Sequence, residues 1–155
     1  MAQKTAPKAE EPIQKYKKVL AAYDGSPNAK RALTRAAHVA SGTGASLRVV
    51  VVVNPITPSY GPIAPNYPQD FIQRIMSEAD RALKEALAMC AGVKGVSGSV
   101  EEGRPAETIL AVAKREGSDL IVVGRRGISG VERFLLGGVS NNVVNNSACD
   151  VLVVK

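Results

Sequence analysis

The segment Leu47–Val53 constrains the fold more than any other part of the sequence, because it ends in five consecutive valines. β-Branched side chains favour extended strands, and a run of this length is typical of one. The valine run has no polar face to turn toward water, so both of its faces must be covered by other elements. Such a strand is typical of a parallel sheet with helices on both sides.

Apolar runs of strand length alternate with amphipathic segments along the rest of the chain. Further strands are predicted at Val19–Ala22, Ser97–Glu101, Leu120–Val123 and Val151–Val154. Helices with an apolar stripe are predicted from Ser26-Pro27 to Gly44, over Ile72–Leu87, from Pro105 to Gly117 and around Val139–Asn146. This alternation predicts a single doubly wound α/β domain over residues 16–155, whose ligand lies beyond the carboxyl ends of the strands.

The net charge of +6 is weak evidence for a nucleic-acid partner, because half of it belongs to the amino-terminal segment. The first 18 residues carry five lysines and two glutamates. Residues 1–15 are rich in Ala, Pro, Lys and Glu, and this composition predicts a disordered basic tail. The remainder has few aromatic side chains on which bases could stack, so we expect no nucleic-acid partner.

No segment resembles a membrane span or a secretion signal. No apolar run approaches the roughly 18 residues that a membrane helix needs, and no apolar core follows the initial Met1-Ala2-Gln3-Lys4. Two cysteines make a disulfide framework implausible, and a single histidine excludes a zinc site of the usual Cys/His type. We therefore expect a cytoplasmic protein without a membrane partner.

The common nucleotide and hydrolase motifs are absent from the sequence. It contains no G-x-G-x-x-G after a strand, no G-x-x-x-x-G-K-[ST] and no G-x-S-x-G, so a dinucleotide fold, a Walker-type NTPase and a hydrolase nucleophile elbow are unsupported. The single histidine, His38, falls on the polar side of the first predicted helix. We expect it to be solvated and without a catalytic role.

The pattern most typical of ligand binding is a pair of glycine-containing turns. Gly124-Arg125-Arg126-Gly127 follows a buried strand, and Gly137-Gly138-Val139-Ser140 opens the last helix. The first N–H groups of a helix are unpaired and carry a partial positive charge, which favours anions. The two arginines add charge, so the pattern indicates a phosphate cradle. Glycines that serve only as turn and cap residues are the alternative that the spacing leaves open.

Four motifs, in order and spacing, resemble those of the universal stress protein family. They are Asp24-Gly25-Ser26, Gly103-Arg104-Pro105-Ala106, Ser118–Gly124 and the G-x-x-G-x9-G element that starts at Gly124. The resemblance covers Tyr16–Lys155. It implies a five-stranded parallel sheet of order 3-2-1-4-5 flanked by helices on both faces, a cytoplasmic homodimer, and membership of the branch that binds ATP.

The resemblance also implies the residues of a nucleotide site. Those at the base and ribose would be Ala22, Asp24 and Val53, and those at the phosphates Gly124, Arg125, Arg126, Gly127, Gly137, Gly138, Val139 and Ser140. The ligand would be ATP, or else ADP or AMP. Independently of the resemblance, hard cations prefer carboxylate oxygens, so Asp24 is a candidate to hold Mg²⁺ through water. The chain departs from the family at Gly138, where the family has Ser or Thr. One hydroxyl donor is lost and the N–H is kept, so we expect roughly tenfold weaker binding.

These features predict a nucleotide-dependent switch in the stress response, with an unidentified protein partner. Beyond Asp24 there is no positioned general base, so we expect at most slow ATP hydrolysis. An interaction module with an empty or vestigial pocket is the main alternative, supported by Gly138. An adenylyl-transfer enzyme on the same architecture is a weaker one, because no histidine follows a strand.

Two further expectations concern segments at strand ends. Val151–Val154 is expected to be an edge strand that pairs with a second copy, with Asp150 and Lys155 meeting across a two-fold axis. Residues 54–68 hold five of the nine prolines. This segment is expected to be either a lid over the pocket or a variable surface loop.

Overall fold

The computed structural model describes residues 15–54, 69–126 and 137–155. Their elements follow one another as β1 (Lys18–Ala22), α1 (Pro27–Thr43), β2 (Ser46–Val53), α2 (Gln69–Met89), β3 (Val96–Glu102), α3 (Pro105–Glu116), β4 (Leu120–Gly124), α4 (Gly138–Asn146) and β5 (Asp150–Val154). The strands form one sheet of order β3-β2-β1-β4-β5, and all of its pairings are parallel. The α/β class and the predicted strand order are confirmed.

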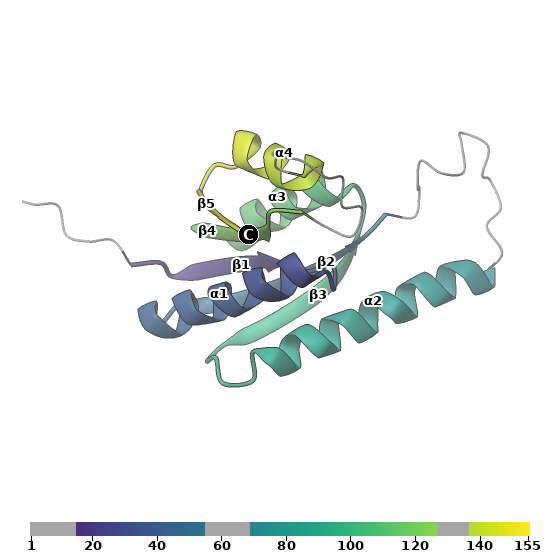
Figure 1. Ribbon diagram of the computed structural model, residues 1–155, viewed down its shortest axis with the longest axis horizontal. Helices are drawn as coiled ribbons and strands as arrows, with labels where there is room; N and C mark the ends of the chain where they lie inside the picture. The colour runs from purple at the N-terminus through teal and green to yellow at the C-terminus, as the bar shows by residue number, and fades with distance from the viewer. Residues whose placement is uncertain (1–14, 55–68, 127–136) are drawn as a thin grey trace, which may run out of the picture.

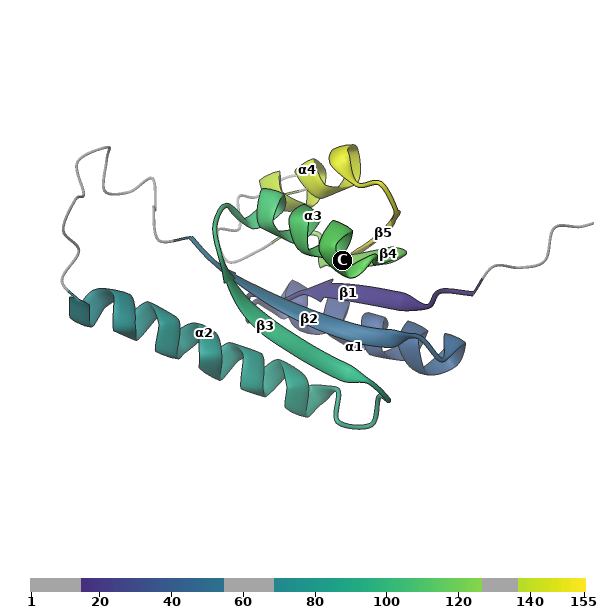
Figure 2. The same ribbon diagram turned by 180° about the vertical axis from the view of Figure 1, so that it is seen from behind.

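The helices cover the sheet from two sides, α1 and α2 from one and α3 and α4 from the other (Figure 1, Figure 2). The valines of β2 alternate between two hydrophobic cores. Val49, Val51 and Val53 pack with α1 and α2, whereas Val50 and Val52 face α3. This is the burial on both faces that the valine run predicts.

Local signals in the sequence account for the ends of α1 and α3. The side chain of Ser26 caps α1 by accepting a hydrogen bond from Ala29 N, and Pro27 is its first residue. Both helices end at a glycine in the left-handed conformation, Gly44 (φ 76°) and Gly117 (φ 67°). The predicted helix starts at Ser26-Pro27 and Pro105 are therefore confirmed.

The segment before β1 is fastened to the body of the domain by hydrogen bonds. The main-chain N–H groups of Lys17 and Lys18 both donate to the carboxylate of Asp119, at 2.8 and 3.0 Å. The hydroxyl of Tyr16 donates to the Asp150 carboxylate at 2.9 Å, at the start of β5. The predicted tail, residues 1–15, lies outside the described part of the chain except for Lys15.

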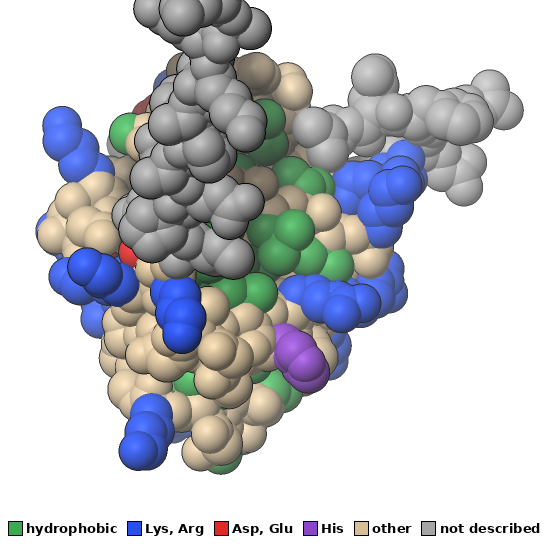
Figure 3. All heavy atoms as spheres, turned by 90° about the vertical axis from the view of Figure 1, so that its left-hand side faces the viewer, with side chains coloured by type: hydrophobic (Ala, Val, Ile, Leu, Met, Phe, Trp, Pro, Cys, Tyr) green, Lys and Arg blue, Asp and Glu red, His purple; other side chains and the backbone are tan. Residues whose placement is uncertain are grey.

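Charged side chains are spread over the surface. Figure 3 shows Lys and Arg side chains at several places on the face that it views, some single and some next to each other, with the histidine at the surface. His38 is exposed, as the sequence predicts. Within the described ranges, no helix is both long and apolar enough to cross a membrane.

Candidate functional site

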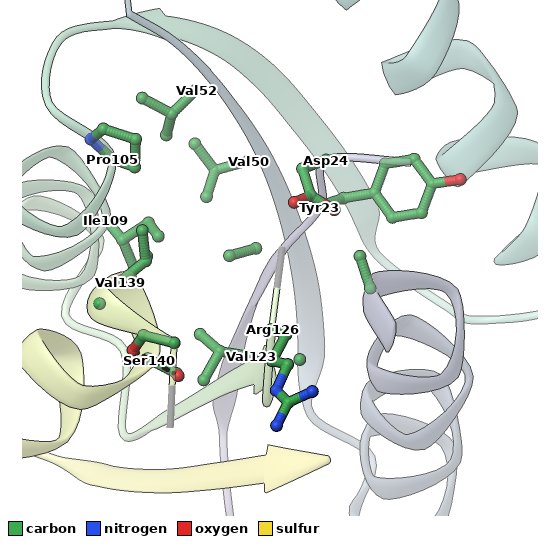
Figure 4. Close-up of a pocket in the computed structure, with 15 residues that line it drawn as sticks. Tyr23, Asp24, Val50, Val52, Pro105, Ile109, Val123, Arg126, Val139 and Ser140 are labelled. Atoms are coloured by element: carbon green, nitrogen blue, oxygen red, sulfur yellow. Dashed lines mark hydrogen bonds between the residues drawn. The ribbon is translucent and has the colours of Figure 1, made fainter. Parts of the chain in front are cut away.

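A cavity of about 480 Å³ lies at the carboxyl edge of the sheet, where the strand order changes direction between β1 and β4. It is lined by residues from β1, β2 and β4 and from the first turns of three helices. They are Ala22, Tyr23, Asp24, Ala29, Val50, Val52, Pro105, Ile109, Val123, Gly124, Arg126, Gly137, Gly138, Val139 and Ser140. Figure 4 shows Val52 and Pro105 at one end of this space and Arg126 and Ser140 at the other.

The turn between β1 and α1 places a carboxylate at the cavity. Asp24 Oδ1 accepts a hydrogen bond from Ser26 N at 3.0 Å, and Gly25 between them has a φ of 79°. A positive φ is readily adopted by glycine, which has no Cβ. The motif Asp24-Gly25-Ser26 thus forms a tight turn that holds the Asp24 carboxylate, and both Ala22 and Asp24 line the cavity.

Tyr23 also lines the cavity, although the sequence gives no sign of it. Its N–H donates to Val50 O at 2.9 Å, which extends the ladder between β1 and β2 by one bond. Its ring points away from the cavity toward the helices on the other side of the sheet (Figure 4). Burial raises the pKa of its hydroxyl, and the negative charge of Glu85 adds to this increase. Tyr23 therefore contributes main chain to the cavity and side chain to the core.

The wall formed by β2 differs from the prediction by one residue. Val53 was expected to line the base slot, but its side chain lies in the core with α1 and α2. Val50 and Val52 line the cavity, facing Pro105 and Ile109 of α3. Successive side chains of a strand point to opposite faces of the sheet. A shift of one residue along β2 therefore moves a side chain from the cavity to the core. Val52 takes the place that was predicted for Val53.

At the end of β4 the chain packs closely against the start of α1. A Cβ on Gly124 would lie 2.9 Å from Asn28 C and 3.1 Å from Ala29 N. Only a residue without a side chain fits this approach unless the helix moves. Gly124 therefore lets the strand end and the first turn of α1 form a common wall of the cavity.

The two arginines that follow Gly124 are placed differently. Arg126 lines the cavity, and its Nε is buried without a hydrogen-bond partner among the described residues. Arg125 contributes main chain: its N–H donates to Val154 O at 2.7 Å, and its C=O accepts from Gly137 N at 2.9 Å. Of these two arginines, only Arg126 lines the cavity with its side chain.

The helix α4 begins at the cavity without a proline and without a side-chain cap. Gly137 is its N-cap residue, and a Cβ on Gly138 would meet nothing within 4 Å. The other two helices that start here, α1 and α3, have Pro27 and Pro105 in the first turn, and proline has no N–H to offer a ligand. Of these three helices, α4 is therefore the one in which every residue of the first turn has an N–H group.

Ser140 and Val139 complete this end of the cavity. The Ser140 side chain is 3% exposed, and its hydroxyl lies 2.9 Å from Arg125 O and 3.0 Å from Gly137 O. Val139 is exposed. Gly127, the remaining residue of the predicted cradle, lies outside the described residues, as does the proline-rich segment 55–68.

The arrangement has an apolar end and a positively charged end. Val50, Val52 and Ile109 offer a dry slot, whereas Arg126 and the amino terminus of α4 offer donors and positive charge. In the described parts of the chain, no three His, Cys, Asp or Glu side chains gather where they could hold a metal ion. Such a cavity can bind a molecule that joins a flat apolar group to an anion.

Comparison with known proteins places these features in a family. The sequence profile of the universal stress protein family matches residues 15–155. A universal stress protein of Thermus aquaticus is 39% identical over 140 residues, which cover 90% of this chain and 99% of that protein. A putative universal stress protein of Staphylococcus epidermidis is 37% identical over 143 residues, with 90% of this chain and 84% of that protein covered.

Solved structures agree with the sequence comparison. Universal stress protein UspA from Lactobacillus plantarum has a TM-score of 0.77 at 26% identity, covering 92% of this chain and 99% of its own. A universal stress protein solved in complex with cAMP has a TM-score of 0.70 at 28% identity, covering 92% and 99% of the two chains. The extent of the profile match and the identity to the Thermus protein lead to one conclusion: this chain belongs to the universal stress protein family.

Proposed function

We propose that this protein binds an adenine nucleotide in the cavity between β1, β2 and β4, and that ATP is the first candidate. The observation that carries the proposal is Arg126, a cation that lines the cavity and whose buried Nε has no hydrogen-bond partner among the described residues. Leaving a buried donor unpaired is unfavourable. The planar guanidinium fits the oxygens of phosphate and carboxylate groups, and a nucleotide supplies the former.

The apolar end of the cavity suits the base. Strand residues direct their main-chain groups to alternate sides, and Val50 O already accepts from Tyr23 N on the β1 side. Val52, two residues further, directs its N–H and C=O to that same side, beyond the end of β1. Adenine has an amino donor next to a ring-nitrogen acceptor, which matches such a pair. The related protein solved with cAMP, an adenine nucleotide, also supports this assignment.

Mg²⁺ and hydrolysis have a limited place in this proposal. Asp24 is the carboxylate at the cavity, and Oδ1 already accepts from Ser26 N. The nucleotide, rather than the chain, would supply most of the oxygen ligands of Mg²⁺, with Asp24 bound through water. Binding rather than turnover is therefore the activity we propose, and nucleotide occupancy would act as the switch.

Calorimetric titration of three proteins with ATP and with adenosine tests the proposal. Replacing Arg126 by Ala removes a charge-assisted hydrogen bond of about 1.5–3 kcal/mol, so ATP should bind roughly ten- to a hundredfold more weakly. Adenosine, which has no phosphate, should bind unchanged. Arg125→Ala is the matched control and should change ATP affinity by less than about threefold, because its side chain does not line the cavity.

The titration has two contrary outcomes. A folded wild-type protein that binds neither ligand overturns the proposal and favours an interaction module with a vestigial pocket. Equal losses of ATP affinity in the two arginine variants would remove the argument from Arg126. Mass spectrometry under native conditions supplies an independent check, since co-purified ATP, ADP or AMP adds its own mass to the protein.

We further propose a cytoplasmic homodimer that pairs through β5. This strand is at the edge of the sheet, and Leu152 is 36% exposed; an unprotected apolar edge is a template for pairing. The Asp150 carboxylate accepts a hydrogen bond from the Tyr16 hydroxyl, and Lys155 O accepts one from Arg31 Nε. These two bonds hold both ends of β5 in place. Sedimentation equilibrium should give a dimer at tens of micromolar, and a monomer there contradicts this part.

A further inference from the structure

We infer that Ser140 is a positioning residue, which aims the amino terminus of α4 at the phosphates and does not itself bind them. The inference rests on the proposed nucleotide function. It differs from the family-based expectation, in which Ser140 lies beside the triphosphate. Its basis is the set of hydrogen bonds that surround the Arg125 carbonyl.

The Ser140 hydroxyl is committed to the main chain of its own loop. Its oxygen lies 2.9 Å from Arg125 O and 3.0 Å from Gly137 O, and the side chain is 3% exposed. A hydroxyl has one proton to donate, and both nearby partners are acceptors. That proton is therefore directed at carbonyl groups and away from any bound phosphate.

The acceptors have other donors, which makes the Ser140 bond an addition to a satisfied network. Arg125 O also accepts from Gly137 N, and Gly137 O also accepts from Asn141 N, both at 2.9 Å. Removing the hydroxyl thus leaves no buried carbonyl without a partner. A Ser140→Ala protein should fold, and its defect should be confined to the placement of the helix start.

The placement matters because the donors of α4 belong to the main chain. Gly137 and Gly138 carry no side chain that could hold the turn, and no side chain caps the helix. The two bonds to Arg125 O, from Gly137 N and from Ser140 Oγ, fix the first turn of α4 against the end of β4. Without the bond from Ser140, the first turn of α4 is held less rigidly. Part of the binding free energy of an anion is then spent on ordering its N–H groups.

The chain offers a matched control at the other end of the same helix. Ser147, the C-cap residue of α4, donates its hydroxyl to Cys149 O at 2.9 Å and accepts from Cys149 N at 3.2 Å, and it is partly buried. Ser147→Ala removes the same kind of bond to a main-chain carbonyl, together with the bond from Cys149 N, at the opposite end of α4 from the cavity. If the role of Ser140 is purely structural, Ser140→Ala should affect ATP affinity no more than Ser147→Ala does.

The test measures ATP and adenosine affinity by calorimetry in the wild-type, Ser140→Ala, Ser140→Thr and Ser147→Ala proteins. We expect Ser140→Ala to weaken ATP about five- to tenfold, the equivalent of one hydrogen bond, and to leave adenosine unchanged. Ser140→Thr keeps the hydroxyl and should restore most of the ATP affinity. Ser147→Ala should bind both ligands as the wild type does.

Amide hydrogen exchange without ligand supplies a second measurement. The Gly137 amide, which donates to Arg125 O, should exchange faster in Ser140→Ala and at the wild-type rate in Ser147→Ala. Wild-type ATP affinity in Ser140→Ala overturns the inference alone. Equal weakening of ATP and adenosine assigns Ser140 to general stability and also overturns it. Failure of the wild type to bind either ligand refutes the proposed function, and the positioning role with it.

Discussion

Adding one methyl group at two glycines of the cavity should change stability in opposite directions. At Gly124 the new Cβ would lie 2.9 Å from Asn28 C, 3.0 Å from Asn28 Cβ and 3.1 Å from Ala29 N. Two of these three atoms are main chain, so the first turn of α1 must shift to relieve the contact. Overpacking of this kind costs about 1–3 kcal/mol, offset by about 0.4–1 kcal/mol from the restricted unfolded chain.

We therefore expect Gly124→Ala to lose about 1–2 kcal/mol of the free energy of unfolding, a decrease of roughly 2–8 °C in Tm for a domain of this size. At Gly138 the same methyl group meets nothing within 4 Å, at the first residue of α4. Only the unfolded-state contribution remains there, so Gly138→Ala should gain about 0.4–1 kcal/mol. Both variants add the same methyl group, so any difference in their stability comes from the surroundings of the two positions.

Urea denaturation of the wild type and the two variants measures these changes, with equal m-values as evidence that the unfolded states are comparable. A Gly124→Ala protein as stable as the wild type would show that the wall between β4 and α1 is not closely packed. A similar loss in both variants would mean that glycine is required for its backbone freedom at both positions. Either result refutes the reasoning from the close approach.

Three further predictions follow from single contacts. Val52→Phe should fill the apolar slot and weaken adenosine at least about tenfold while Tm changes little, as titration and thermal melts will establish. The hydrogen bond to Asp150 raises the pKa of Tyr16 above 10.0; stability from this contact is therefore present below pH 10 and is lost as the pH rises through the folded value. Tyr16→Phe should remove that pH dependence and lower the free energy of unfolding by less than about 1 kcal/mol. If the variant unfolds at alkaline pH as the wild type does, the Tyr16 contact does not contribute in this way. The hydrogen bond from Arg115 lowers the pKa of Glu101 below 4.5, so its contribution, about 0.5 kcal/mol, is present above pH 4.5 and is lost as the pH falls through the folded value. Glu101→Gln should make the free energy of unfolding less dependent on pH in the acid range. Equal acid dependence in the variant and the wild type argues against a contribution from the ion pair.

The fold could be predicted from the sequence because its strongest signals are local. The valines of β2 demand cover on both faces, and the cap at Ser26 and the glycines after α1 and α3 mark helix boundaries without reference to the rest of the chain. The order of the strands came from the family resemblance. Local patterns alone predict alternating strands and helices but not their neighbours in the sheet.

The details of the site were harder to predict, because they depend on the direction in which each side chain points. In a run of identical valines nothing distinguishes the two faces, so Val53 was placed where Val52 lies. Arg48 held the missing signal: a charged residue within β2 indicates that even-numbered residues face the less completely covered side. Arg125 and Arg126 were treated alike for the same reason, although only one side chain reaches the cavity.

The peptide groups on either side of Arg125 join two parts of the molecule that have separate proposed roles. The Arg125 N–H holds the last residue of β5 through Val154 O, and the C=O holds the start of α4 through Gly137 and Ser140. Ordering the end of β5 therefore restricts the start of α4, and ordering the start of α4 restricts the end of β5. If copies of the chain associate along β5, anion binding and association form a thermodynamic cycle, in which each must change the other's equilibrium constant by the same factor. A residue that touches neither the base nor the partner strand through its side chain would then set the sensitivity of the assembly to its ligand.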